Sequence, residues 1–318
     1  MLAAAGLTLL VGGVVTATRG HRWWGRSGAS VGVLLLTATT VVVVSPAVAA
    51  TNVPRPAIGP TPTSVGLDYE DVTLRTADGA ALAAWYVASS NGAAVVLLHG
   101  AGSTRSDVLA QAEVIARAGY GVLLVDARGH GQSSGRAMDF GWDGDADIAA
   151  ATEHLATRPD VDGDRLGVVG LSMGGEEALG ATRSNRAIRA VVAEGATGRV
   201  AADDAWLSER FGARGLLQEQ LEQLQDIVTD VLTSASVPTS CRAAVEASDA
   251  SYLLISAGDV PDEERFAAHL SAGAPDRVQT WTVDGAGHTG GLRTAPAQWG
   301  AEVVGFLDRT LLGDDRTP

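Results

Sequence analysis

The sequence predicts an α/β fold: a mostly parallel sheet flanked by helices, preceded by an apolar N-terminal segment. From Asp68 onward, short apolar runs alternate with segments of helical periodicity. Repeated strand–helix units imply parallel strands covered by helices on both faces. The chain is 46% hydrophobic and 19% charged, which is too apolar for a disordered chain. The region from Asp68 holds about 250 residues, a size common for one such domain.

The candidate strands begin with a hairpin, because residues 72–75 and 81–87 flank the turn Ala77-Asp78-Gly79. Ala93–Leu98 is an unbroken apolar run, which is typical of a strand buried on both faces. The further expected strands cover residues 121–125, 166–171, 188–193, 252–256 and 278–283. Helices are expected at residues 107–118, 145–156, 173–183, 262–271 and 297–311.

One region interrupts this alternation. Residues 197–249 lie between two expected strands and contain no strand candidate. Leu216 to Leu232 has helical periodicity, with glutamine and glutamate between the leucines. A segment of about 50 residues is too long for a plain loop in a compact domain. We therefore expect a small helical cap over the strand ends.

Composition excludes several classes of function. The net charge is −14, and a strongly acidic chain is a poor candidate for binding nucleic acid. All 23 basic residues are arginine. This excludes enzymes that form a Schiff base on a lysine and nucleotide-binding proteins that need a P-loop lysine. The single cysteine, Cys241, excludes an internal disulfide framework and a multi-cysteine zinc site. We expect neither a metal nor an organic cofactor.

Residues 1–50 are expected to form a membrane anchor. Met1 to Thr18 and Ser27 to Pro54 carry no charge, and a short connector between them holds Arg19, Arg22 and Arg26 beside two tryptophans. About 20 apolar residues span the hydrocarbon core, so the second stretch qualifies and the first is marginal. Basic residues favour the cytoplasmic side. A two-helix hairpin would therefore place the rest of the chain outside the cytoplasm, at the cell membrane.

Two alternatives remain for this segment. Ala47-Val48-Ala49 resembles a signal-peptidase site, so residues 1–50 could instead be a long signal sequence of a secreted protein. Buried helices of a soluble protein are the other alternative. Residues 51–67 hold four prolines and indicate a stiff, extended linker, which leaves residues 68–318 for the α/β domain with its cap.

The strongest chemical motif is Gly170-Leu171-Ser172-Met173-Gly174, which matches G-x-S-x-G between an expected strand and an expected helix. Strand–turn–helix is the context in which this motif exposes a nucleophilic serine. The helix that follows directs its N-terminal dipole at the site and favours a developing oxyanion.

A second motif, His99-Gly100-Ala101-Gly102, follows the apolar strand 93–98. A loop of small residues there can direct a backbone N–H at the same point as the N–H of Met173. We therefore name Ala101 and Met173 as the oxyanion-hole donors, and expect His99 itself to be structural.

His288 is the expected general base. It lies in a glycine-rich loop after the last expected strand, which is a suitable place for the partner of Ser172. The other histidines fit less well: His21 lies in the connector, His154 and His269 lie in helices, and His130 lies in a turn.

An imidazole base needs a carboxylate to fix its tautomer, and the chain order serine, acid, histidine places that acid between Ser172 and His288. Asp259 comes first after the penultimate strand and is our first choice. Asp262 and Glu263 are the alternatives, although either could instead begin the following helix. Glu194 is a more distant candidate. Asp145 and Asp147 precede the serine and suit a helix start better.

From about Asp68 to Leu312 the chain resembles the α/β-hydrolase superfamily. The resemblance rests on the His99-Gly100 loop, the segment from Asp126 to Gly135, the Ser172 turn and the Gly287-His288 loop, in the family's order. It implies an eight-stranded, mostly parallel sheet, a Ser–Asp/Glu–His triad and a helical cap after strand six. It also implies that His130 is structural. The acid loop departs from the usual G-x-x-D spacing, which leaves the identity of the acid open.

These motifs predict an ester hydrolase that works through an acyl-enzyme on a small-molecule substrate. A peptidase, a thioesterase or a lipase is the alternative within the fold. A haloalkane dehalogenase is disfavoured because the turn holds serine and not a carboxylate. The alternative of another class is a membrane-anchored binding module without catalysis. The sequence does not indicate an oligomeric state.

Overall fold

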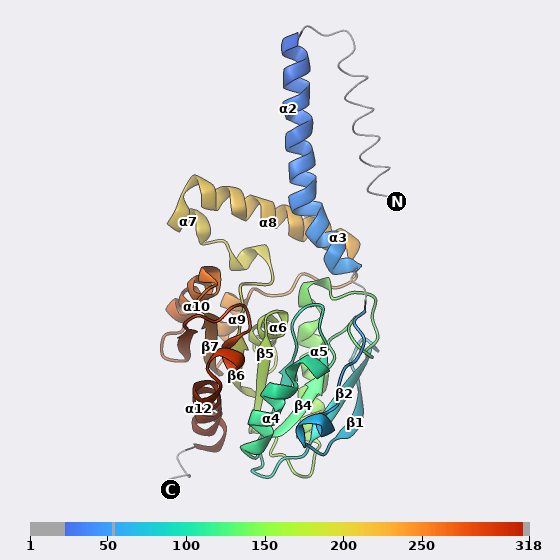
Figure 1. The fold of residues 1–318 in the computed structure, drawn as a ribbon, viewed down its shortest axis with the longest axis vertical. Coiled ribbons are helices and arrows are strands. Elements are labelled where there is room, and N and C mark those ends of the chain that lie inside the picture. The colour runs from blue at the N-terminus through green and yellow to red at the C-terminus, as the bar shows by residue number, and fades with distance from the viewer. Residues whose placement is uncertain (1–22, 53–54, 314–318) are drawn as a thin grey trace.

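An eight-stranded sheet forms the centre of the structure, a computed structural model that describes residues 23–52 and 55–313 (Figure 1). The strand order is β1-β2-β4-β3-β5-β6-β7-β8. β2 pairs antiparallel with β1 and β4, and all other neighbouring strands are parallel. The strands are β1 Glu70–Arg75, β2 Ala81–Val87, β3 Ala94–Leu98, β4 Gly121–Val125, β5 Leu166–Leu171, β6 Ile188–Glu194, β7 Ser251–Ala257 and β8 Val278–Val283. The predicted α/β fold with its mostly parallel sheet is confirmed.

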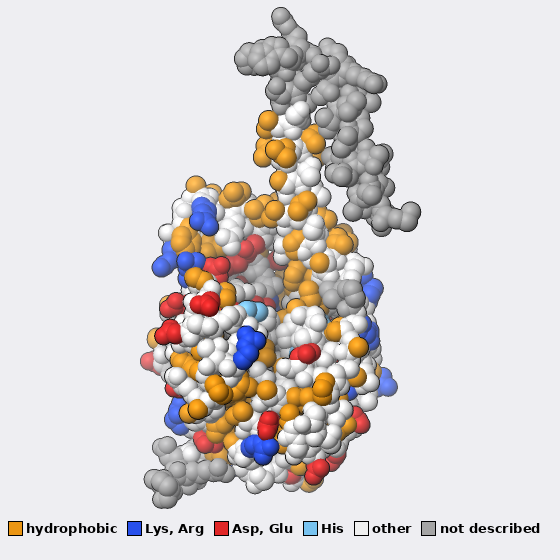
Figure 2. Space-filling view, viewed as in Figure 1, with side chains coloured by type: hydrophobic (Ala, Val, Ile, Leu, Met, Phe, Trp, Pro, Cys, Tyr) orange, Lys and Arg blue, Asp and Glu red, His pale blue; other side chains and the backbone are white. Residues whose placement is uncertain are grey.

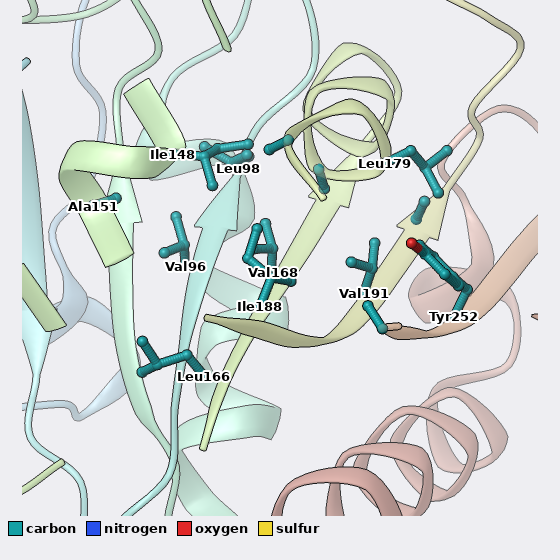
Figure 3. Close-up of a cluster of buried hydrophobic side chains, with 14 of the residues drawn as sticks. Val96, Leu98, Ile148, Ala151, Leu166, Val168, Leu179, Ile188, Val191 and Tyr252 are labelled. Atoms are coloured by element: carbon teal, nitrogen blue, oxygen red, sulfur yellow. The ribbon is translucent and has the colours of Figure 1, made fainter. Parts of the chain in front are cut away.

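Side chains alternate between two hydrophobic layers along the central strands. Val95 and Leu97 of β3 face one layer, and Val96 and Leu98 face the other. The first layer lies under helices α4 (Leu109–Arg117) and α12 (Pro296–Leu307). The second lies under α5 (Gly144–Ala156), α6 (Met173–Ala181), α9 (Cys241–Ala247) and α10 (Pro261–Gly273), as Figure 3 shows in part. Burial on both faces explains why these strands are continuous apolar runs in the sequence.

An apolar helix stands out from the domain at the N-terminal end of the described chain (Figure 1). It runs from α2 (Trp23–Thr39) through a π-helical turn at Thr40–Val44 into α3 (Ser45–Thr51). Residues 30–51 are long and apolar enough to cross a membrane, and their most apolar 18-residue stretch has a mean hydropathy of 2.2 with 11% of its residues buried. This is the one such helix among the described residues. The first helix of the expected hairpin falls on residues 1–18, outside the described residues.

The proline-rich segment packs against the domain. Pro62–Val65 forms a 3-10 turn in which Pro62 is buried, and Ile58, Val65 and Leu67 contact the layer under α4 and α12. Arg55 donates hydrogen bonds to the backbone carbonyls of Ser133 and Gly135. From Arg55 on, the segment expected to be a stiff, extended linker is packed on the domain, because its apolar residues cover a hydrophobic surface.

The chain between β6 and β7 forms helices joined by loops and contains no strand. It contains a short turn at Ala201–Asp203, then α7 (Leu207–Phe211), α8 (Ala213–Leu232) and α9. Cys241 and Val245 place α9 in the hydrophobic core, whereas α7 and α8 stand above the body of the domain and beside the N-terminal helix (Figure 1). We call α7 and α8 the cap; α8 packs against α3 and the π-helical turn.

Candidate active site

Ser172 lies at the sharp turn between β5 and α6. Its backbone has φ 52° and ψ −122°, a left-handed conformation that costs an ordinary residue free energy and that persists where the surroundings enforce it. A Cβ at Gly170 would lie 2.1 Å from the carbonyl oxygen of Gly174, and a Cβ at Gly174 would lie 2.7 Å from that of His99. The glycines of the G-x-S-x-G motif are therefore required by close backbone contact.

The structure brings Ser172 and His288 together from positions 116 residues apart. The Oγ of Ser172 lies 2.9 Å from Nε2 of His288, and Nδ1 of His288 lies 2.6 Å from Oε1 of Glu263. An ionised carboxylate only accepts hydrogen bonds, so Nδ1 carries the proton and Nε2 is free to accept from the serine hydroxyl. The Glu263 side chain is 1% exposed, and that of His288 is 49% exposed.

The carboxylate that contacts His288 is Glu263, and not our first choice, Asp259. The turn after β7 is held by hydrogen bonds from the Asp259 N–H to the Ala286 carbonyl and from the Gly258 N–H to the Val283 carbonyl, and the Asp259 side chain is exposed. Asp262 is also exposed and pairs with Arg265. Glu263 lies in the first turn of α10 and is directed back to the sheet edge, where Oε2 accepts from the Ala257 N–H at 2.8 Å.

The hydrogen bond to Glu263 raises the pKa of His288 above its ordinary value of 6.5, and this effect outweighs that of burial, which lowers it. The carboxylate stabilises the imidazolium, as a proton-accepting base requires. A base with its pKa near the working pH combines a useful unprotonated fraction with a strong drive for proton transfer.

The proposed oxyanion donors, Ala101 and Met173, line the same cavity as Ser172. Met173 is the first residue of α6, where backbone N–H groups have no acceptor within the helix. The Ala101 loop lies close to Ser172, because a Cβ at the neighbouring Gly100 would be 3.2 Å from the Cβ of Ser172. The arrangement suits two amides that converge on one oxygen beside Ser172.

Two histidines near the site have structural partners. His99 is fully buried: Nε2 accepts from the Ala127 N–H at 3.1 Å and Nδ1 lies 2.8 Å from the Gly100 carbonyl. His130 accepts from the Gly102 N–H at 3.1 Å. Burial lowers the pKa of both rings, that of His99 to about 4, so both hold the Ala101 loop as neutral hydrogen-bonding groups.

Glu194 supports the loop that carries His288. It is buried at the end of β6, and its two oxygens accept from the Gly291 N–H and from Nε1 of Trp299, each at 2.8 Å. The sequence marked Glu194 only as a distant candidate for the acid. Its partners identify a positioning residue, which periodicity could not reveal because both partners lie about 100 residues away.

The aspartates before the serine form ion pairs. Asp145 contacts Arg199 and Asp147 contacts Arg128, each at 2.8 Å. Neither carboxylate is a contact of His288 in the described structure. Both lie in the first turn of α5, in agreement with the helix-start interpretation.

A cavity of about 760 Å³ opens beside Ser172 under the cap. Figure 2 shows the hollow between the cap and the body of the domain, with acidic side chains in it. Its lining includes Asp204, Glu222 and Asp226 together with Arg214 and Arg265. Burial raises the pKa of Asp226 to about 6, and burial with the neighbouring Glu222 raises that of Asp204 to about 9. Among the described residues no group of three or more His, Cys, Asp or Glu side chains is arranged to hold a metal ion.

The sheet topology with a serine at the turn after β5 defines the chain as an α/β hydrolase. Residues 89–255 match the family described as serine aminopeptidase, S33. Because this match covers more than half of the chain, the protein belongs to that family, a family of hydrolases.

Among solved structures, the esterase Pf2001 of Pyrococcus furiosus shares the fold. The TM-score is 0.63 at 24% identity, over 82% of this chain and 98% of the esterase. Among curated proteins, the chain is 36% identical over 130 residues to the uncharacterized protein Rv2307c of Mycobacterium tuberculosis, which is 39% of this chain and 46% of that protein. It is 33% identical over 121 residues to the uncharacterized membrane protein YNL320W of Saccharomyces cerevisiae, 37% of this chain and 42% of that protein. The chain thus spans less than half the length of these curated relatives.

Proposed function

We propose that the protein is a serine hydrolase that cleaves an ester through an acyl-enzyme, with Ser172 as nucleophile, His288 as general base and Glu263 as the acid. The observation that carries the proposal is the continuous chain of contacts from Ser172 Oγ through the imidazole to Glu263, at 2.9 Å and 2.6 Å. In the three-residue arrangement Glu263 fixes the tautomer and stabilises the imidazolium.

In the first half of the reaction, Nε2 of His288 takes the proton from Ser172 as Oγ bonds to the acyl carbon. The carbonyl oxygen becomes an oxyanion, held by the N–H groups of Ala101 and Met173. Removal of one such donor typically costs about 3 kcal/mol of transition-state stabilisation. His288 then returns the proton to the leaving alcohol, and the ester C–O bond breaks. In the second half a water molecule repeats the sequence and releases the acid and Ser172.

A Ser172→Ala variant tests the proposal with p-nitrophenyl butyrate as substrate. We expect the rate to fall by at least about a thousandfold, since loss of the nucleophile removes the covalent route. A fluorophosphonate probe should label the wild-type serine and leave Ser172→Ala unlabelled. Unchanged hydrolysis in the variant would overturn the assignment, and a wild-type chain that is neither labelled nor active would favour the non-catalytic binding module.

A peptidase that recognises an amine is the second candidate. The family description names aminopeptidases, and the cavity contains Asp226, whose pKa of about 6 leaves it mainly ionised at neutral pH. A carboxylate in a partly desolvated cavity attracts an ammonium group. The two candidates separate by comparing aminoacyl p-nitroanilides with the same compounds acetylated on the amine. A preference for the free amine that Asp226→Asn abolishes would favour the peptidase, and equal rates would favour the esterase.

We further propose that the N-terminal helix anchors the protein in the cell membrane with the hydrolase domain outside the cytoplasm. The span of residues 30–51 and the membrane protein among the relatives support the anchor. The basic connector supports the orientation. Protease digestion of intact cells tests it: we expect loss of the domain from intact cells, whereas protection would reverse the orientation and release into the medium would favour a cleaved signal.

A further inference from the structure

Helix α8 has its apolar side chains on the outside. Its buried residues are Gly215, Glu219 and Thr229. Six of its large apolar residues are exposed. Leu232, at the C-terminal end, is 37% accessible. The other five are 45% to 79% accessible: Leu216, Leu217, Leu224, Ile227 and Val231. At 100° per residue these five fall on one continuous arc of the helix, with Gln220 as the one polar side chain among them.

The opposite, polar face of α8 lines the cavity and accepts hydrogen bonds from the backbone of the domain. Gln218, Glu222 and Asp226 line the cavity beside Ser172. Oδ2 of Asp226 accepts from the Ala201 N–H at 2.8 Å, and Oε1 of Glu219 accepts from the Ser208 N–H at 2.6 Å. These contacts fix the rotation of the helix, so the apolar arc must face away from the domain. A cap helix in water normally has the reverse arrangement.

The apolar arc lies beside the base of the N-terminal helix. α8 packs against α3 and the π-helical turn, and Figure 1 shows α8 running across the lower end of that helix. Val41 and Val42 of the turn and Val48 of α3 are also exposed, and Figure 2 shows apolar side chains on both parts of this surface. The apolar surface of the anchor therefore continues onto α8.

The anchor also fixes where a bilayer would end. Ala47, Ala50 and Thr51 are completely buried in the protein, whereas Leu34, Leu35 and Leu36 are 57% to 68% exposed. The helix would therefore leave the bilayer between these two groups of residues, close to Val41 and Val42. Helix α8 packs against the N-terminal helix at this same level (Figure 1).

We propose that α8 lies in the surface of the same lipid bilayer that holds the N-terminal helix, with its apolar arc among the acyl chains and its polar face over the cavity. A helix with one apolar and one polar face has a stable position in the plane of the membrane interface. The proposal extends the anchor suggested above and does not depend on the reaction that the site catalyses. It places the cavity directly beneath the membrane surface.

The experiment uses the full chain in phosphatidylcholine vesicles. An environment-sensitive fluorophore is attached to Ile227→Cys and, in separate samples, to Val231→Cys and to Leu35→Cys in the anchor. The matched control on α8 is Asp230→Cys, an exposed position off the arc, and Asp249→Cys marks the far end of the domain. The unmodified chain is the labelling blank because Cys241 is buried. Lipids with a quencher at a shallow acyl position are then added.

We expect the labels at Ile227 and Val231 to be quenched to at least half the extent of that at Leu35, the label at Asp230 to be quenched less, and that at Asp249 not at all. Quenching at Ile227 and Val231 no stronger than at Asp249 would overturn the proposal. So would a blue-shifted label that lipid does not quench, because that result indicates a protein partner or a second copy on the arc. The readout needs no catalysis, so an active esterase without quenching would contradict the interface alone.

Discussion

Helices α6 and α8 both border the cavity, and they are opposite in construction. All nine residues of α6 are buried, and its first turn is in contact with the strand that delivers Ser172. In α8 three of twenty residues are buried, and none of the three is a large apolar residue. α6 is held by burial of its whole surface, whereas α8 is held on one polar face and at its two ends, by α7 and by α3. The two walls of one cavity therefore face two different surroundings.

The same contrast separates the two halves of the site. The groups proposed for the chemistry are fixed by close contacts, such as Gly174 against His99 and Glu194 against Trp299. The other side contributes ionisable carboxyl groups with raised pKa values, Asp226 of α8 and Asp204 just before α7. We therefore expect substitutions on the sheet side to change rate or stability strongly, and those on the outer face of α8 to change neither much.

After replacement of Ser172 itself, the largest effect is expected for the acid of the proposed triad. Glu263→Gln should lower kcat/KM by about a hundredfold or more, because an amide neither stabilises the imidazolium nor fixes the tautomer. Asp259→Asn is the matched control, since that side chain is exposed, and it should leave kcat/KM almost unchanged. If Asp259→Asn were the damaging substitution, the acid would lie in the turn after β7 and the geometry at α10 would not be the working one.

The next largest effect is on the free energy of unfolding, when a leucine is replaced by alanine in α6 and in α8. Leu179→Ala in α6 removes a side chain with no exposed surface and should cost about 2–5 kcal/mol of unfolding free energy. Leu224→Ala in α8 removes one that is 45% exposed and should cost less than about 0.5 kcal/mol. Denaturant titration of the full chain in detergent measures both. Equal losses of unfolding free energy would show that Leu224 is buried in solution, and this would contradict an exposed outer face of α8.

The smallest effect is a displacement of the pH profile. The proposed base, His288, would act in its neutral form, and its pKa lies above 6.5, so kcat/KM should rise with pH through a midpoint above 6.5. The hydrogen bond to Glu263 is the main cause of the raised pKa of His288. In Glu263→Gln the remaining activity should therefore rise at a lower pH than in the wild type. If the midpoint does not change when Glu263 is replaced, the group that titrates is not His288 in its hydrogen bond with Glu263.

Much of this arrangement can be predicted from local sequence. The strands at 93–98 and 121–125 are apolar runs because both of their faces are covered. Ser172 follows from a motif whose glycines are required by backbone contact, and His288 follows from a loop at the end of the last strand. These features depend on residues close together in the chain or on the order of the strands.

The acid could not be predicted in this way. Asp259, Asp262 and Glu263 lie within five positions, and the choice among them depends on which side chain α10 directs at the sheet edge. That direction is set by the hydrogen bonds of Gly258 and Asp259 to the loop after β8, more than 20 residues away. The packing of residues 55–67 on the domain was missed for a related reason, because their proline content conceals the apolar contacts of Ile58 and Leu67.

One guanidinium determines where this chain can be shortened. Arg136 donates to the carbonyl of Thr51 at the end of α3 and to that of Leu232 at the end of α8, at 2.7 and 3.0 Å, so both helix ends are attached to the same point of the domain. A version of the protein that begins just before Ser45 would retain all of these contacts and lose most of the apolar helix. A version that begins after Thr51 would lose the hydrogen bond from Arg136 to the Thr51 carbonyl and would leave α8 without α3, the helix it packs against. A form of the protein without most of the apolar helix should therefore begin just before Ser45, the first residue of α3.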